Sequence, residues 1–350
     1  MKKFALIAAL GAAMLCFIEG FCSVISVFSR PVAEPAHTRY DEQLGWINQP
    51  NLSVPNLYGP GIWFKTNSRS TRNEQEFSAS VPRGKIRVIC SGDSFTLGYG
   101  VNNDEAWCSQ LAGLDHRLET VNMGQGGYGV DQSYLWYMRD GTKLRPDVHL
   151  FAFTSYDFDR MASASFWGYA KPVLRLVDGR VEASHVPVPK RPALLPWLRK
   201  KVHPLQDLAL AQMLQRWRNK LAPGVRRRPQ DRPELAVALK LFEELATQAR
   251  ASAAALALVY LPTPEDLEDA GGSAGLRDYL RSQAAQRGIP FVDLTSDFAR
   301  LPPGESSALF QSRSDFLGGA GHYTAAGNRY AAQVLYRSLR GSLVSAGRGR

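Results

Sequence analysis

The sequence predicts an α/β protein: a three-layer α/β/α sandwich on a doubly wound, flavodoxin-like parallel sheet. Short apolar runs alternate with longer amphipathic stretches from residue 85 onward, and turn-forming, glycine-rich segments follow the first two runs. Continuous apolar strands between amphipathic helices are typical of a parallel sheet covered on both faces. With 350 residues, of which 45% are hydrophobic and 21% charged, the chain is long enough for one sizeable core.

The apolar runs predict five strands, at residues 86–90, 120–123, 148–153, 256–260 and 290–292. The amphipathic stretches predict helices at 104–112, 131–144, 233–252, 276–287 and 324–339. Doubly wound folds bind ligands at the carboxyl ends of their strands. Residues directly after the predicted strands are therefore the candidates for a functional site.

The first 30 residues predict a membrane anchor or signal segment. Lys2 and Lys3 precede an apolar run over residues 4–28 that is broken by Glu19. This run has the length that a bilayer span requires, and the basic end would stay on the cytoplasmic side. We therefore expect an inner-membrane anchor with the following domain in the periplasm or outside; a cleaved signal is the alternative.

Residues 31–84 are rich in turn formers and scattered aromatics, which indicates an extended segment packed on the main domain, with a hairpin as one form of it. The main domain is predicted over 85–345, with an insertion at about 160–232 that contains an amphipathic helix at 205–221. This helix has three candidate roles: packing on the core, covering the site as a lid, or contacting an anionic membrane surface.

The net charge of +10 is concentrated in the insertion. Residues 190–232 hold twelve Lys or Arg and two Asp, a net of +10, so the rest of the chain is neutral. One basic insertion does not make a nucleic-acid-binding fold and is better matched to an anionic lipid or an acidic polymer. No Cys/His group has metal-ligand spacing, so neither a metal nor a cofactor is expected. Cys90 and Cys108 are left as either a disulfide or two buried thiols.

Ser94 is the candidate nucleophile. It follows the first predicted strand in the run Gly92-Asp93-Ser94-Phe95-Thr96, and a late loop, Gly321-His322-Tyr323-Thr324, supplies an imidazole. A hydroxyl on one loop and a histidine on a distant one are how hydrolases assemble a nucleophile and its base.

These runs resemble the SGNH (GDSL-type) esterase and acyl-hydrolase superfamily. The second block of that family is similar to residues 122–129, and the agreement extends over roughly residues 85–340. The resemblance implies the SGNH hydrolase fold and a serine esterase mechanism. It gives Ser94 the role of nucleophile and His322 that of base, and it places the amides of Ser94 and Gly127 in an oxyanion hole. Asp93 is expected to orient the loop.

The sequence departs from the family pattern twice. Tyr156 stands where the third block usually has an Asn that donates to the oxyanion, and we expect its hydroxyl, or that of Ser155, to substitute. Gly319 stands where the family has an Asp three residues before the histidine. Asp315 is then the nearest acid to orient His322; Asp157, Asp159 or a main-chain carbonyl are the alternatives.

The expected function is an exported serine esterase that acts on an ester-bearing small molecule or an acylated envelope polysaccharide, with O-acetyl groups as one target. The alternatives are an O-acyltransferase that modifies exopolysaccharide, and a non-catalytic domain that binds glycan or a partner.

Overall fold

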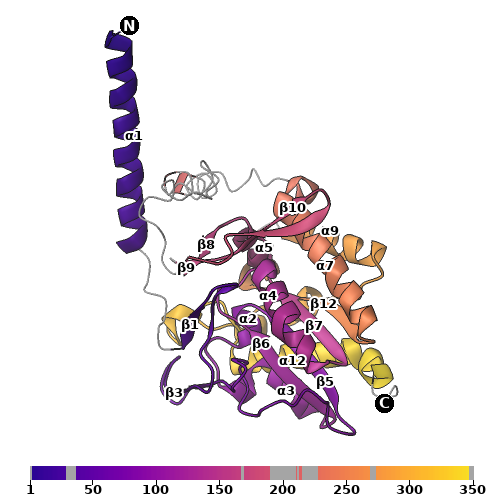
Figure 1. Ribbon diagram of the computed structural model, residues 1–350. Coiled ribbons are helices and arrows are strands. Elements are labelled where there is room, and N and C mark those ends of the chain that lie inside the picture. Colours follow the sequence, from indigo (N-terminus) through magenta and orange to yellow (C-terminus); the bar gives the residue numbers. More distant parts are fainter. Residues whose placement is uncertain are drawn as a thin grey trace.

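The computed structural model describes residues 2–28, 37–166, 169–189, 210, 213–214, 228–268 and 273–346. Its centre is a parallel sheet in the order β13-β12-β7-β5-β6 (Figure 1). The strands are β5 (Ile86–Gly92), β6 (Leu118–Gly124), β7 (Val148–Phe153), β12 (Ala255–Tyr260) and β13 (Phe291–Asp293). Of these five strands, β5 comes first along the chain and lies between β6 and β7, as in a flavodoxin-like sheet. The predicted fold class is therefore confirmed.

Helices cover both faces of the sheet. The larger ones are α3 (Trp107–Leu114), α4 (Val130–Trp136), α5 (Ser155–Met161), α7 (Pro233–Ala251), α9 (Ala274–Gln286) and α12 (Ala325–Ala346). Shorter ones are α2 (Ser94–Leu97), α8 (Pro264–Leu267), α10 (Thr295–Ala299) and α11 (Pro303–Ser307), with single turns η1 (Asn103–Glu105), η5 (Pro229–Asp231) and η6 (Leu317–Gly319). The helix predicted at 131–144 is instead α4 followed by a π-helical turn, η2 (Tyr137–Gly141), and a 3₁₀ turn, η3 (Thr142–Leu144).

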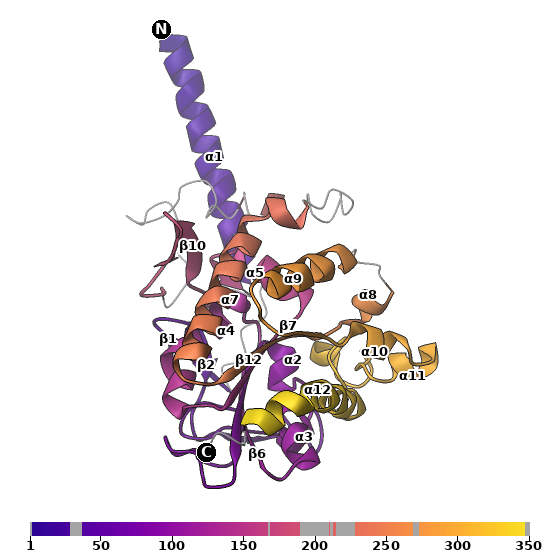
Figure 2. The same ribbon diagram turned by 90° about the vertical axis from the view of Figure 1, so that its right-hand side faces the viewer.

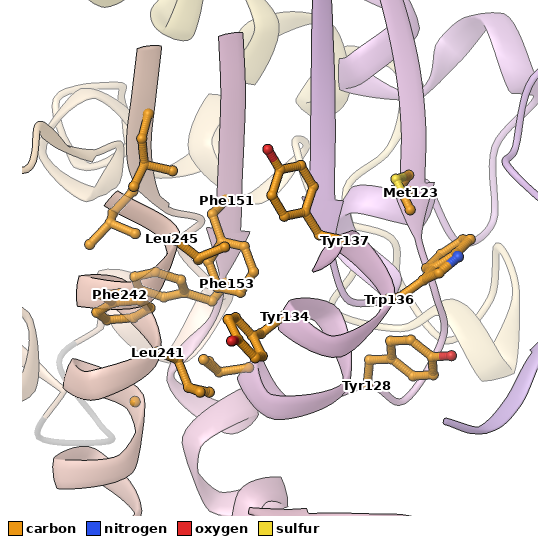
Figure 3. Packing of buried hydrophobic residues seen from close by; sticks show 14 of the residues in the cluster. Met123, Tyr128, Tyr134, Trp136, Tyr137, Phe151, Phe153, Leu241, Phe242 and Leu245 are labelled. Carbon is orange, nitrogen blue, oxygen red and sulfur yellow. The ribbon is translucent and has the colours of Figure 1, made fainter. Parts of the chain in front are cut away.

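Alternate residues of each central strand pack into different layers. In β7, Phe151 and Phe153 pack against α4 and α7, whereas Leu150 and Ala152 face the layer of α3 and α12. Figure 2 shows α7 and α12 on opposite sides of the sheet, and Figure 3 shows Phe151 and Phe153 beside Phe242 of α7. Because side chains alternate along a strand, both faces must be apolar when both are covered, which explains the uninterrupted apolar runs of the sequence.

The segment before β5 folds into two antiparallel hairpins. These pair β1 (Thr38–Asp41) with β2 (Gly45–Asn48), and β3 (Ser53–Pro55) with β4 (Trp63–Lys65). Trp46 of β2 donates its indole N–H to the Gly126 carbonyl at 2.9 Å, and Gln125 accepts a hydrogen bond from the Asn48 amide at 2.7 Å. The segment therefore holds the loop that follows β6.

The described part of the insertion is two further hairpins, β8 (Ser165–Phe166) with β9 (Tyr169–Ala170), and β10 (Val173–Val177) with β11 (Arg180–Ser184). β9 contacts β2, and β10 packs on α7. The helix predicted at 205–221, and most of the basic cluster at 190–232, lie outside the described residues.

The predicted membrane anchor is not supported. Residues Lys2–Phe28 form one helix, α1, that projects from the α/β body (Figures 1 and 2). Among the residues that the structure describes, however, no helix combines the length and the apolarity needed to cross a bilayer. Glu19 accepts hydrogen bonds from the Ser23 hydroxyl at 3.4 Å and from the Leu210 amide at 2.9 Å.

Cys90 and Cys108 are free thiols buried in the layer between the sheet and α3. Of the two alternatives left by the sequence, the structure therefore has two buried thiols.

Candidate active site

Ser94 lies at the carboxyl end of β5 as the first residue of α2. The preceding residue, Asp93, caps this helix: its carboxylate accepts a hydrogen bond from the Phe95 amide at 2.9 Å. The tight strand-to-helix turn fixes the Ser94 side chain at the edge of the sheet where the other loops meet. Asp93 thus orients the loop, as its place in the sequence predicted.

His322 reaches Ser94 from the loop before α12. Its Nε2 lies 2.8 Å from Ser94 Oγ, and its Nδ1 lies 3.1 Å from the Gly319 carbonyl oxygen. Because a carbonyl can only accept, Nδ1 carries the proton and Nε2 is left as the acceptor for the Ser94 hydroxyl. This is the tautomer that a general base requires.

Asp315 does not orient the imidazole. Its carboxylate accepts from the amide and the hydroxyl of Ser312, both at 2.8 Å, which lowers the pKa of Asp315. The main-chain carbonyl of Gly319, one of the alternatives considered from the sequence, takes that place. A Cβ at position 319 would lie 2.3 Å from Oε1 of Gln311 and 2.7 Å from the Phe316 ring, so any side chain there requires these two side chains to shift.

Aromatic rings hold the imidazole in place. Phe95 stacks on His322 with 4.8 Å between ring centroids, and Tyr99 lies at 5.1 Å. Burial lowers the pKa of His322, opposed by the negative charge of Asp93 and by the Gly319 carbonyl. A depressed pKa keeps the ring neutral, and so competent as a base, at neutral pH.

Two main-chain amides are available to an oxyanion. Within the described chain, neither the Ser94 nor the Gly127 N–H donates a hydrogen bond to another protein group. Gly127 has φ +79°, and a Cβ there would come within 2.6 Å of the Phe166 ring. Glycine is needed at this position for both reasons.

Tyr156 lies on the first turn of α5, with 41% of its surface exposed. Its role as a third oxyanion donor stays a prediction.

The sequence reasoning missed Arg160, which joins the three loops of the site. Its Nη1 donates to Asp93 at 3.1 Å, to the Tyr128 carbonyl at 2.9 Å, and to Asp157. These partners follow β5, β6 and β7 respectively. Burial, and then the charge of Asp93, hold the pKa of Asp157 well above its usual range. The i, i+3 spacing of Asp157 and Arg160 was the only signal in the sequence.

A second serine–histidine pair lies inside the sheet. Ser91 Oγ is 2.9 Å from Nε2 of His149, and both residues are buried. Burial lowers the pKa of His149 to about 3. This pair has the contact of a catalytic dyad but no access for a substrate. Over the described residues, no group of three or more His, Cys, Asp or Glu side chains could hold a metal ion.

The fold and the centre define a class of protein: an α/β/α sandwich with a serine and a histidine in contact at the carboxyl edge of a flavodoxin-like sheet. Residues 90–330, more than half of the chain, match the GDSL-like lipase/acylhydrolase family model, and the chain belongs to that family.

Solved structures similar to this chain include a member of the lipolytic protein G-D-S-L family from Veillonella parvula DSM 2008. It is 14% identical, has a TM-score of 0.41, and the match covers 73% of this chain and 98% of that one. An acetyl xylan esterase is 14% identical with a TM-score of 0.41, over 73% of this chain and 100% of that one. The lipase/acylhydrolase from Enterococcus faecalis is 12% identical with a TM-score of 0.39, over 73% and 96%. No curated protein matches the chain.

Proposed function

We propose that the protein is a serine esterase in which Ser94 and His322 form a catalytic dyad. The contact that carries this proposal is the 2.8 Å distance between Ser94 Oγ and His322 Nε2. It is a distance at which a proton passes directly between the two groups. The GDSL-like family membership and the two available amides support the same reading.

The geometry supports a two-step reaction. Ser94 Oγ attacks the ester carbonyl carbon while His322 Nε2 takes the hydroxyl proton. The amides of Ser94 and Gly127 donate to the tetrahedral oxyanion, and His322 then gives its proton to the departing alcohol as the C–O bond breaks. Water, deprotonated by His322, attacks the acyl-enzyme and releases the acid together with Ser94.

The Gly319 carbonyl replaces the usual carboxylate. It holds the tautomer of His322 but carries no full negative charge to stabilise the imidazolium that forms during each step. We therefore expect a slower enzyme than one with a charged third member, since an acid in that role stabilises the imidazolium.

The proposed substrate is an ester with a small acyl group, such as an acetylated carbohydrate. Phe166 of the insertion packs directly against Gly127, which narrows the space beside the oxyanion loop. Acyl transfer to a sugar hydroxyl uses the same steps with a different acceptor and is the second candidate. Export of the domain stays a prediction.

Labelling with a fluorophosphonate probe tests the proposal. The intact protein should be labelled and should hydrolyse p-nitrophenyl acetate, whereas Ser94→Ala should do neither. Ser91→Ala is the matched control, because Ser91 also contacts a histidine but is buried inside β5. It should be labelled like the wild type.

The outcomes separate the candidate functions. A folded wild-type protein that is neither labelled nor active would refute the esterase and favour a binding domain. Faster appearance of acetylated oligosaccharide than of free acetate would identify a transferase.

A further inference from the structure

A cavity of about 250 Å³ lies beside the hairpin of β1 and β2. Ser94 is not among the residues that line it. Its wall comes from β1, β2, the loop at 68–71, the end of β6, and the turns η2 and η3. None of the residues proposed for ester hydrolysis lines it.

The lining is rich in cations. Arg39, Arg69, Arg139 and Lys143 all border the cavity. Carboxylates offset part of this charge. Arg139 forms salt bridges with Asp41 and Asp140, and Lys143 forms one with Asp140. Glu76 is attracted electrostatically to Arg69. Four cations against three acids leave a positive balance, and the exposed Arg39 and Arg69 form no salt bridge with an acid among the described residues.

We infer that this cavity binds a small ligand through an anionic oxygen group, a phosphate, sulfate or carboxylate. Guanidinium groups match such oxygens in geometry as well as charge, and Arg39, Arg69 and Arg139 all line the cavity. The volume is below that of sites for drug-sized molecules, so the ligand is an inorganic ion or a single acidic sugar or metabolite unit.

The site adjoins the oxyanion loop through one strand. In β2, Ile47 lines the cavity while its neighbour Trp46 holds the Gly126 carbonyl. An occupied cavity therefore stiffens the strand that supports the loop of Gly127, although the binding itself does not depend on ester hydrolysis.

Isothermal titration calorimetry at constant ionic strength tests the inference. Inorganic phosphate, sulfate and glucuronate are titrated into the full-length protein, with chloride as the balancing ion. We expect saturable one-site binding of at least one of them. The tightest of the three distinguishes an inorganic ion from a sugar acid.

Variants locate the site. Arg39→Gln and Arg69→Gln should each raise the Kd about tenfold or more, the usual loss for a charge-assisted hydrogen bond. Arg300→Gln, on an exposed arginine of the opposite sheet edge, should leave it unchanged, as should Ser94→Ala.

The absence of saturable binding of all three anions would overturn the inference. So would a Kd that Arg39→Gln and Arg69→Gln leave within twofold of the wild type. Both substitutions are on exposed side chains, so folding should be retained in each, and circular dichroism confirms it.

Discussion

Replacing Arg160 with methionine should both destabilise the protein and slow the reaction. The guanidinium is the shared partner of Asp93 and Asp157, whose side chains are 1% and 2% exposed. Removing one member of a buried ion pair leaves uncompensated charge in a dry environment, at a cost of about 3–5 kcal/mol. For a domain with a total stability of about 5–15 kcal/mol, this is a large fraction.

The catalytic effect follows from the same contacts. Asp93 caps α2, so a shift of its carboxylate moves Ser94 relative to His322. A displacement of about 1 Å at a reacting group costs on the order of a hundredfold in rate. Because Arg160 touches none of the reacting atoms, it is a positioning residue, and kcat should fall more than KM rises.

Urea unfolding and p-nitrophenyl acetate turnover measure the two effects. Arg300→Met is the control, since the Arg300 side chain is 76% exposed and pairs with Asp297 at 3.8 Å, and such solvated pairs contribute about 0–1 kcal/mol. A second variant, Arg160→Met with Asp157→Asn, removes one of the two stranded carboxylates and should recover part of the lost stability. If Arg160→Met loses no more stability than Arg300→Met and keeps its kcat, the reasoning is refuted.

Further predictions concern the dyad, the oxyanion loop and a buried histidine. His322→Ala should abolish turnover with folding intact. Asp315→Asn should change kcat by less than about twofold, because a solvated carboxylate without contact to the imidazole contributes little. A large loss of kcat in Asp315→Asn would show that Asp315 takes part in the reaction. The acid limb of kcat/KM should lie below pH 6.5, since His322 must be neutral and burial lowers its pKa from 6.5; a limb above 6.5 would contradict this. Gly127→Ala should lower kcat and destabilise the fold by about 1–3 kcal/mol, from the positive φ and the contact with the Phe166 ring, and unchanged kinetics would remove that amide from the oxyanion hole. The unfolding free energy should fall by about 2 kcal/mol between pH 6.5 and 5, because the pKa of His149 is about 3 in the folded state and 6.5 in the unfolded state, so only the unfolded chain binds the extra proton. His149→Leu should lose this part of the pH dependence. An identical slope in the variant would show that His149 is not its source.

The sequence alone was sufficient for the sheet and for the choice of a serine and a histidine that lie in contact in the fold. Short apolar runs predict buried strands because both faces of a covered parallel sheet must exclude water, and the five predicted strands all form. Ser94 and His322 were identifiable because the runs around them resemble blocks of the SGNH family, with Ser94 directly after a predicted strand and His322 just before the last predicted helix.

Tertiary structure alone decided how the dyad is supported. Asp315 is close to His322 along the chain, but its carboxylate accepts hydrogen bonds from Ser312. The main-chain carbonyl of Gly319 contacts the imidazole instead, and a sequence cannot indicate this because every residue has a main-chain carbonyl. The sequence gives Arg160 no evident partner beyond Asp157. In the folded chain its guanidinium also binds Asp93 and the Tyr128 carbonyl, so that it joins the loops after β5, β6 and β7. The periodicity of a sequence reports which residues are buried, whereas the partner of a polar atom depends on which distant segments meet, and only the folded chain determines that.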